Sequence, residues 1–242
     1  MGKAISHNLI SDSEDIFILL SNKNKIEYKN KNVFVEQINL KNYEIVFNKL
    51  SKLISQFEII DGFNIILCGS QLGEPNKDSM NLNLEDISTT FNCNLIGNIA
   101  IIKAASQFLT TKSILRVVFF AGGGAAYAYP NFFSYSLSKV ATVRAVENLS
   151  ILLKNITNNT SIIALAPGAV ETDMLKSVIE NGGYVKTKTD ISEPVNFIRN
   201  FIYDRIPSLS LNGMFIHVRD DLNDINSIVD QNSEIYKLRR IQ

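Results

Sequence analysis

The sequence of 242 residues is poor in the residue types on which several classes of site depend. It has two cysteines, two histidines and no tryptophan. Cys68 and Cys93 give no disulfide framework, which is typical of a reducing compartment. His7 and His217 lie far apart in the sequence and have no neighbouring Cys/His cluster, so neither a zinc site nor a Ser-His-Asp triad is indicated. We therefore expect no bound metal.

The charge and hydropathy patterns argue against two further classes of partner. Lys and Arg total 24, as do Asp and Glu, and no segment concentrates basic and aromatic residues, so nucleic acid is not expected. The longest apolar runs, such as 95–105, are interrupted by Gly97, Asn98 and Lys103 and are too short to cross a membrane. No charged and then apolar leader follows Met1. These patterns predict a cytoplasmic protein that acts on small molecules.

Short apolar runs alternate with longer helical patterns along the chain. The expected strands are 16–20, 33–38, 63–67, 115–120, 161–166 and 214–218. The expected helices are 43–56, 84–109, 133–154 and 192–203. This alternation predicts an α/β fold in which helices cover both faces of a parallel sheet, within a single domain over residues 1–242.

Tyr135 and Lys139 lie four residues apart at the start of an expected helix. Four residues are slightly more than one helical turn, so both side chains share a face. A free tyrosine has a pKa of about 10, and a neighbouring cation favours the phenolate and lowers that pKa. The pair is a candidate for proton transfer, although the same spacing also suits a packed tyrosine and a solvated lysine.

Two glycine-containing turns follow expected strands. Residues 121–126 read Ala-Gly-Gly-Gly-Ala-Ala, and residues 166–172 read Ala-Pro-Gly-Ala-Val-Glu-Thr. Glycine lets the backbone approach a ligand closely, and ligands in open α/β sheets bind outside the carboxyl ends of the strands. Both turns could also be simple connections, and Thr172 could cap a helix as readily as contact a ligand.

Taken together, these motifs resemble the short-chain dehydrogenase/reductase family, whose members are nicotinamide-dependent oxidoreductases on a Rossmann-type, doubly wound and mostly parallel sheet. The family's Tyr-x-x-x-Lys matches Tyr135 and Lys139, and its helical asparagine matches Asn94 within 91–97. Its Pro-Gly-x-Val-x-Thr matches 167–172. The motifs agree in order and spacing over nearly the whole length.

The resemblance implies an NAD(P)-dependent oxidoreductase that interconverts an alcohol and a ketone, sugar-derived ones included. Tyr135 would be the general acid/base, Lys139 would lower its pKa and hold the nicotinamide ribose, and Asn94 would anchor a water molecule. The cofactor-binding residues that it implies are Asn39, Gly69, Tyr135, Lys139, Pro167, Gly168, Val170 and Thr172. It also implies a homo-oligomer, dimer or tetramer, formed through helices 84–109 and 133–154 and strand 214–218. We expect 171–188, which contains Gly182 and Gly183, to be a mobile substrate lid, although an ordinary variable loop would fit the same sequence.

The site departs from the family pattern at its serine. The family places a serine about thirteen residues before the tyrosine to hydrogen-bond the substrate oxygen, and here Gly122 occupies that place. Loss of one such donor costs about 100-fold to 1,000-fold in rate. Ser134, Tyr127, Tyr129 or a hydroxyl of the substrate could replace it.

The cofactor motifs are also incomplete. Of the family's Asn-Asn-Ala-Gly segment only Gly69 matches, and Asn39 stands where an aspartate often contacts adenine. The strand 16–20 is not followed by the acid that binds the ribose hydroxyls, which leaves both NAD and NADP open. Lys23 slightly favours NADP.

The largest departure lies at the start, where the chain reads Met-Gly-Lys-Ala-Ile at 1–5, as the family's first helix does from its last glycine. We expect a sheet without the family's first strand and Gly-rich phosphate loop, because either the true start lies upstream or the chain is a degenerate relative. The alternative function is a non-catalytic, family-like binding or assembly protein. An extended-branch epimerase or dehydratase is a third possibility, against which the short C-terminal part argues.

Overall fold

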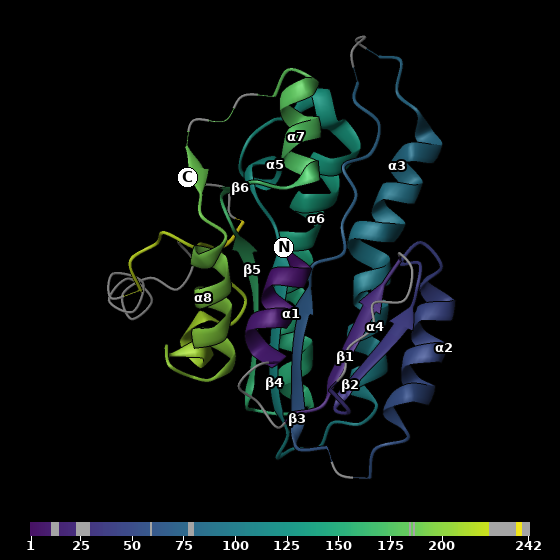
Figure 1. Cartoon of the computed structure of the whole chain (residues 1–242), viewed down its shortest axis with the longest axis vertical. Coiled ribbons are helices and arrows are strands. Elements are labelled where there is room, and N and C mark those ends of the chain that lie inside the picture. The colour runs from purple at the N-terminus through teal and green to yellow at the C-terminus, as the bar shows by residue number, and fades with distance from the viewer. Residues whose placement is uncertain are drawn as a thin grey trace.

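The computed structural model describes residues 1–10, 15–22, 30–58, 60–76, 80–183, 185, 187–222 and 236–238. Six strands match the six expected ones to within one residue at each end, and helices alternate with them (Figure 1). These strands are β1 (Phe17–Ser21), β2 (Val33–Gln37), β3 (Gly62–Leu67), β4 (Ile114–Phe120), β5 (Thr160–Ala166) and β8 (Phe215–His217). The predicted α/β fold with a parallel sheet is confirmed.

The strands are all parallel but form two separate ladders. β3, β4, β5 and β8 are hydrogen-bonded in that order, whereas β1 pairs only with β2. Figure 1 shows the β1–β2 pair set apart from the four-stranded sheet. Among the residues that the structure describes, no strand joins β1 to β3, as expected from the missing family strand.

Helices cover both faces of the four-stranded sheet. On one face α4 (Gly97–Ser106) and α6 (Phe133–Leu152) pack on the strands, and α2 (Tyr43–Ile54) packs against α4. α1 (Gly2–Ile10) and α8 (Ser192–Ile202) contribute to the core on the opposite face. β4 and β5 are buried between these layers, so apolar side chains occupy both faces of each strand instead of alternating with polar ones.

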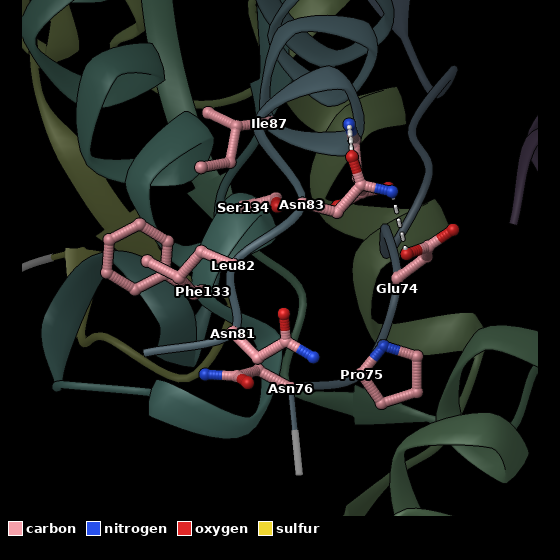
Figure 2. Close-up of a pocket in the computed structure, with 10 residues that line it drawn as sticks. Glu74, Pro75, Asn76, Asn81, Leu82, Asn83, Ile87, Phe133 and Ser134 are labelled. Atoms are coloured by element: carbon pink, nitrogen blue, oxygen red, sulfur yellow. Dashed lines mark hydrogen bonds between the residues drawn. The ribbon is translucent and has the colours of Figure 1, made fainter. Parts of the chain in front are cut away.

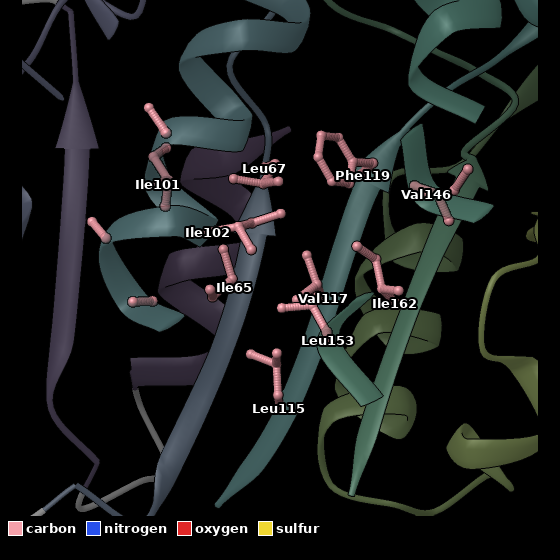
Figure 3. Close-up of a cluster of buried hydrophobic side chains, with 14 of the residues drawn as sticks. Ile65, Leu67, Ile101, Ile102, Leu115, Val117, Phe119, Val146, Leu153 and Ile162 are labelled. Carbon is pink, nitrogen blue, oxygen red and sulfur yellow. The ribbon is translucent and has the colours of Figure 1, made fainter. Parts of the chain in front are cut away.

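The larger core lies between α4, α6 and the sheet (Figure 3). Ile102 of α4 and Val146 of α6 approach Val117 and Ile162 of the central strands. Val117 and Ile162 are fully buried, and burial of one such side chain contributes about 1.5–3 kcal/mol before the cost of ordering the chain. This packing holds the carboxyl ends of β3, β4 and β5 in fixed positions.

The expected helix 84–109 is broken in its middle. It consists of α3 (Leu84–Phe91), a π-helical turn η1 (Asn92–Ile96) and α4. Asn83 caps α3 by accepting hydrogen bonds from the backbone N–H groups of Glu85 and Asp86. A π-turn inside a helix is often found at a functional site, and this one contains Asn94.

Several short elements were not expected from the sequence. They are α5 (Gly123–Ala126), α7 (Asp173–Glu180), β6 (Ala169–Val170), β7 (Lys188–Thr189) and the 3-10 turns η2 (Pro130–Phe132), η3 (Leu153–Asn155) and η4 (Ser208–Leu211). Figure 1 shows α5 and α7 at the end of the molecule to which the central strands point. In the described parts of the chain, no helix has the length and apolar character needed to span a bilayer.

Candidate active site

The predicted site residues gather at the carboxyl edge of the four-stranded sheet. Gly69 follows β3, Gly122 follows β4, and Gly168 follows β5. Parallel strands end at a common edge, so these three turns are neighbours. Tyr135 lies in the first turn of α6, which begins where the connection from β4 ends.

Tyr135 and Lys139 meet inside the protein. The Lys139 side chain is only 3% exposed, and its Nζ lies 5.4 Å from the centroid of the Tyr135 ring. That Nζ donates a hydrogen bond of 2.8 Å to the carbonyl oxygen of Phe120, the last residue of β4. The ammonium is thereby fixed between the central strand and the tyrosine ring.

The pKa of Tyr135 is raised in the structure, whereas the sequence led us to expect a lowered pKa. Burial, and secondarily the nearby Tyr129, raise the pKa of Tyr135 to about 12. Burial lowers the pKa of Lys139 to about 8, against the opposing influence of Cys93 and Cys68. Desolvation, and not the lysine that was expected to favour the phenolate, sets the direction of the shift. Tyr135 is therefore a neutral phenol at pH 7, a form that can give a proton to a substrate oxygen.

Asn94 ties the turn after β3 to the helix that carries Tyr135. Its side-chain amide donates to the Gln71 carbonyl and to Ser138 Oγ, each at 2.9 Å, and its oxygen accepts from the Gln71 N–H at 2.7 Å. Ser138 Oγ in turn donates to the Tyr135 carbonyl at 2.7 Å. Asn94 is 1% exposed, so these bonds satisfy a fully buried amide and fix the first turns of α6.

Gly122 lies beside the reactive end of Tyr135. A Cβ added at Gly122 would come within 3.9 Å of the Tyr135 hydroxyl oxygen. Gly122 has a φ of 151°, a backbone conformation that side-chain-bearing residues rarely adopt. The family's serine position therefore faces the tyrosine here too, but its backbone favours glycine.

Ser134 does not fill the empty serine position. Its hydroxyl donates a 2.6 Å hydrogen bond to Asp86 of α3, which holds it away from any ligand. A pocket opens next to it, between the start of α6 and the residues ahead of α3 (Figure 2). Across that pocket Asn83 donates to Glu74 at 3.1 Å, and apolar side chains such as Leu82 and Phe133 complete the lining.

Glycines at two of the predicted cofactor positions permit close contacts. A Cβ at Gly69 would lie 2.3 Å from Leu40 Cδ1. Gly168 has a φ of 72°, and a Cβ there would lie 2.0 Å from Thr189 Oγ1. Both turns thus depend on glycine for packing within the protein, whatever they bind.

The other predicted cofactor residues have varied environments. Pro167 leads into the Gly168 turn, and Val170 is buried in β6. Thr172 caps α7, its hydroxyl oxygen accepting from the Leu175 N–H at 3.2 Å. Asn39 is exposed after β2 and accepts from the Lys41 N–H at 3.0 Å, and Lys23 lies outside the described residues.

Sequence reasoning missed Gln71 and Ser138, which hold Asn94. Ser138 directly precedes Lys139 in the Tyr-x-x-Ser-Lys stretch, so its place in that motif was an available signal. Gln71 contributes mainly its backbone N–H and carbonyl groups, and such bonds cannot be predicted from the residue type. A further contact brings α1 to the site, because a Cβ at Gly2 would lie 3.4 Å from Cys68 Cβ.

The sequence model described as short chain dehydrogenase matches residues 1–182. The chain belongs to this family. Membership assigns it to a family of enzymes, and residues 1–182 include Tyr135, Lys139, Asn94 and Gly122.

Relatives and solved structures agree with this membership. NADPH-dependent reductase BacG of Bacillus subtilis (strain 168) is 30% identical over 113 residues, which are 47% of this chain and 42% of that relative, so the match spans less than half of it. 4-Hydroxyisoleucine dehydrogenase complexed with NADH superposes with a TM-score of 0.69 at 20% identity, over 89% of this chain and 90% of the other. ElxO with NADP bound gives a TM-score of 0.71 at 14% identity, over 90% and 92%. At these identities the solved structures show a shared fold.

Proposed function

We propose that the protein is an NAD(P)-dependent oxidoreductase that interconverts an alcohol and a ketone, with Tyr135 as the general acid/base. One observation carries the proposal: a half-buried phenol and a buried ammonium lie together at the carboxyl edge of the sheet, beside a glycine turn, in a short chain dehydrogenase chain. Perturbed titratable groups gathered at such an edge are typical of active sites.

The residues at this edge suit the nicotinamide end of a dinucleotide. Lys139 would hold the nicotinamide ribose with its ammonium, and Val170 and Thr172 would contact the carboxamide. Asn39 offers an exposed side chain to adenine at the end of β2. The names of the relatives mention NADPH, NADH and NADP, which supports a nicotinamide nucleotide and leaves the choice between the two forms open.

The protein's own part in the reaction is proton transfer and positioning. A bound nicotinamide nucleotide would supply or accept the hydride. In the reductive direction the neutral Tyr135 hydroxyl gives its proton to the substrate oxygen. Lys139, whose pKa of about 8 lies near neutrality, can return a proton toward the phenol. Asn94 and Ser138 keep the first turns of α6 in place during the exchange.

The second candidate is a non-catalytic member that keeps the fold for binding or assembly. Two observations favour it: Gly122 replaces the family's serine, and β1 is not hydrogen-bonded to β3. The buried lysine beside the phenol favours catalysis instead, because burial of an ionisable lysine costs stability and gives a binding scaffold nothing.

Turnover by a Tyr135→Phe variant tests the proposal. The probes are acetoin, cyclohexanone and dihydroxyacetone, each with NADH and with NADPH, followed by absorbance at the nicotinamide band. We expect Tyr135→Phe to lower kcat by about 100-fold to 10,000-fold, as loss of a general acid does, while Tyr127→Phe keeps full rate. Equal rates in Tyr135→Phe and the parent would remove Tyr135 from the mechanism, and absence of turnover by the parent with every probe would favour the binding protein.

We propose that copies of the chain associate through α3, α4 and α6. Leu84, Ile96 and Leu137 are exposed apolar side chains on this part of the surface. Exposed apolar side chains on the helices of a soluble protein are candidates for a contact with another chain. Sedimentation equilibrium should give a multiple of 27.1 kDa, and a monomer mass would contradict the proposal.

We also propose that 171–188 closes over the substrate. Its two ends are tied together because β6 pairs with β7, and Glu171 and Lys188 form an exposed ion pair of 3.6 Å. α7 lies between these ends. Protease cleavage within this segment should slow when NADPH is added, and an unchanged rate would contradict the role of a lid.

A further inference from the structure

The substrate oxygen in the proposed reaction needs a donor besides Tyr135. Negative charge develops on this oxygen during reduction, and a second fixed donor stabilises it. Gly122 has no hydroxyl to offer, although its Cα faces the Tyr135 hydroxyl. The inference below rests on the proposed function and concerns which group replaces the serine.

The hydroxyls nearest to Tyr135 in sequence are already engaged. Ser134 donates to Asp86, Ser136 to the Phe133 carbonyl at 3.1 Å, and Ser138 to the Tyr135 carbonyl. Tyr127 points into solvent, with 79% of its surface exposed. None of these four groups is placed to donate into the site.

Tyr129 is placed differently, because its ring is anchored and its hydroxyl is not. The ring packs on that of Phe132, with centroids 5.2 Å apart, and Phe132 is fully buried. In the part of the chain that the structure describes, no protein group hydrogen-bonds the Tyr129 hydroxyl. The phenol is therefore held in one orientation with a free donor at its tip.

The tip of Tyr129 lies on the side of the site that the lid covers. A Cβ added at Gly183, in the turn after α7, would come within 2.7 Å of the Tyr129 hydroxyl oxygen. Tyr129 contributes to the raised pKa of Tyr135, and partial burial raises the pKa of Tyr129 itself. Both phenols keep their protons at neutral pH.

We propose that Tyr129 is a second catalytic hydroxyl, which donates a hydrogen bond to the substrate oxygen in place of the family's serine. The hydroxyls of Tyr135, on α6, and Tyr129, beside the Gly183 turn, would both donate hydrogen bonds to this oxygen. Tyr129 transfers no proton: the proton that completes the alcohol comes from Tyr135, and the hydride comes from the nicotinamide.

A Tyr129→Phe variant removes the hydroxyl and keeps the ring that packs on Phe132. With acetoin, cyclohexanone and dihydroxyacetone as probes, we expect kcat to fall by about 100-fold to 1,000-fold, the usual effect of losing one such donor. The melting temperature and the NADPH affinity measured by fluorescence should stay at the parent values. Tyr127→Phe, which removes an exposed phenol hydroxyl two residues away, is the matched control and should keep the parent kcat.

The results distinguish failure of this inference from failure of the proposed function. If Tyr129→Phe keeps kcat within twofold of Tyr127→Phe while Tyr135→Phe is inactive, the oxidoreductase stands and Tyr129 is not its second donor. If the parent chain reduces none of the probes with either nucleotide, both the function and the role of Tyr129 are contradicted. A fall in kcat confined to Tyr129→Phe and Tyr135→Phe supports both.

Discussion

A buried cation lies at each end of β4, and the two differ in how fully their N–H groups are hydrogen-bonded within the protein. Toward its amino end, Arg116 is 2% exposed and donates all five of its N–H groups: two to Asp204, two to Asn159 and one to the Leu115 carbonyl. At its carboxyl end, Lys139 is 3% exposed and donates to the Phe120 carbonyl. A fully satisfied cation secures a fold, whereas a buried cation with donors to spare is suited to a ligand.

The two environments also shift pKa values differently. Burial alone would raise the pKa of Asp204, but the hydrogen bonds from Arg116 and Ser208 and the charge of Arg116 together lower it. At the other end burial dominates and lowers the pKa of Lys139. The comparison predicts that loss of Lys139 harms activity without harming stability, and that loss of Arg116 does the reverse.

Lys139→Met should give the largest effect on activity. We expect kcat/KM to fall by about 100-fold to 10,000-fold, because the variant loses the group that supports proton transfer. Lys154→Met, at an exposed position just after α6, is the control and should keep the parent rate. Full activity in Lys139→Met would contradict the different roles proposed for Lys139 and Arg116.

The same variant should be more stable than the parent at pH 7. The folded-state pKa of Lys139, about 8, lies below the ordinary value of 10.5, so charging this lysine opposes folding. This cost is fully present below pH 8 and fades as the pH rises toward 10.5. Lys139→Met should therefore raise Tm by about 2–6 °C at pH 7 and by less at pH 10, in thermal melts. An increase in Tm that grows with pH would contradict the lowered pKa of Lys139.

Arg116→Met should act on stability. Loss of the guanidinium leaves the acceptors on Asn159, Leu115 and Asp204 without their donor, and we expect the free energy of unfolding to drop by about 2–4 kcal/mol. Urea unfolding measures it, with the exposed Arg205→Met as control. The folded fraction should keep its turnover. A free energy of unfolding within about 0.5 kcal/mol of that of Arg205→Met, the usual range for surface changes, would contradict the stabilising role of Arg116.

Asp204→Asn should have the smallest effect and a pH signature. Because the folded-state pKa is lowered, the carboxylate stabilises the protein above its unfolded-state pKa, and this contribution is lost as the pH falls through the folded value. Asp204 is half exposed, so we expect about 1 kcal/mol or less at pH 7. Urea unfolding at pH 7 and pH 3 should show the difference between the parent and the variant shrinking in acid, and a constant difference would exclude the ion pair as its source.

The strands were predictable because their signal is local. The apolar runs of β4 and β5 reflect burial between two helix layers, and all six strands were located to within one residue. The break in helix 84–109 was not predictable, since its π-turn accompanies bonds from Asn94 to residues 23 and 44 positions away. α7 was missed although Thr172 marks its start, because the same threonine was equally suited to a ligand.

The sequence indicated which candidate side chains lie near one another, but not their electrostatics. The motifs named Tyr135, Lys139 and Asn94, and the fold brings them to one edge of the sheet. The spacing of Tyr135 and Lys139 suggested a lowered phenol pKa, whereas the depth of burial raises it. Burial depends on the layers packed around α6, which a spacing of four residues cannot reveal.

Titration of NADH and NADPH into the protein, followed by nicotinamide fluorescence, tests most directly whether the carboxyl end of the sheet is a nucleotide-dependent active site. We predict saturable binding of at least one nucleotide, weakened about tenfold or more in Lys139→Met and unchanged in Arg116→Met at temperatures where that variant is folded, since a lost hydrogen bond to a charged group costs about 1.5–3 kcal/mol. Binding of neither nucleotide, or equal binding by Lys139→Met and the parent, would contradict the proposed site.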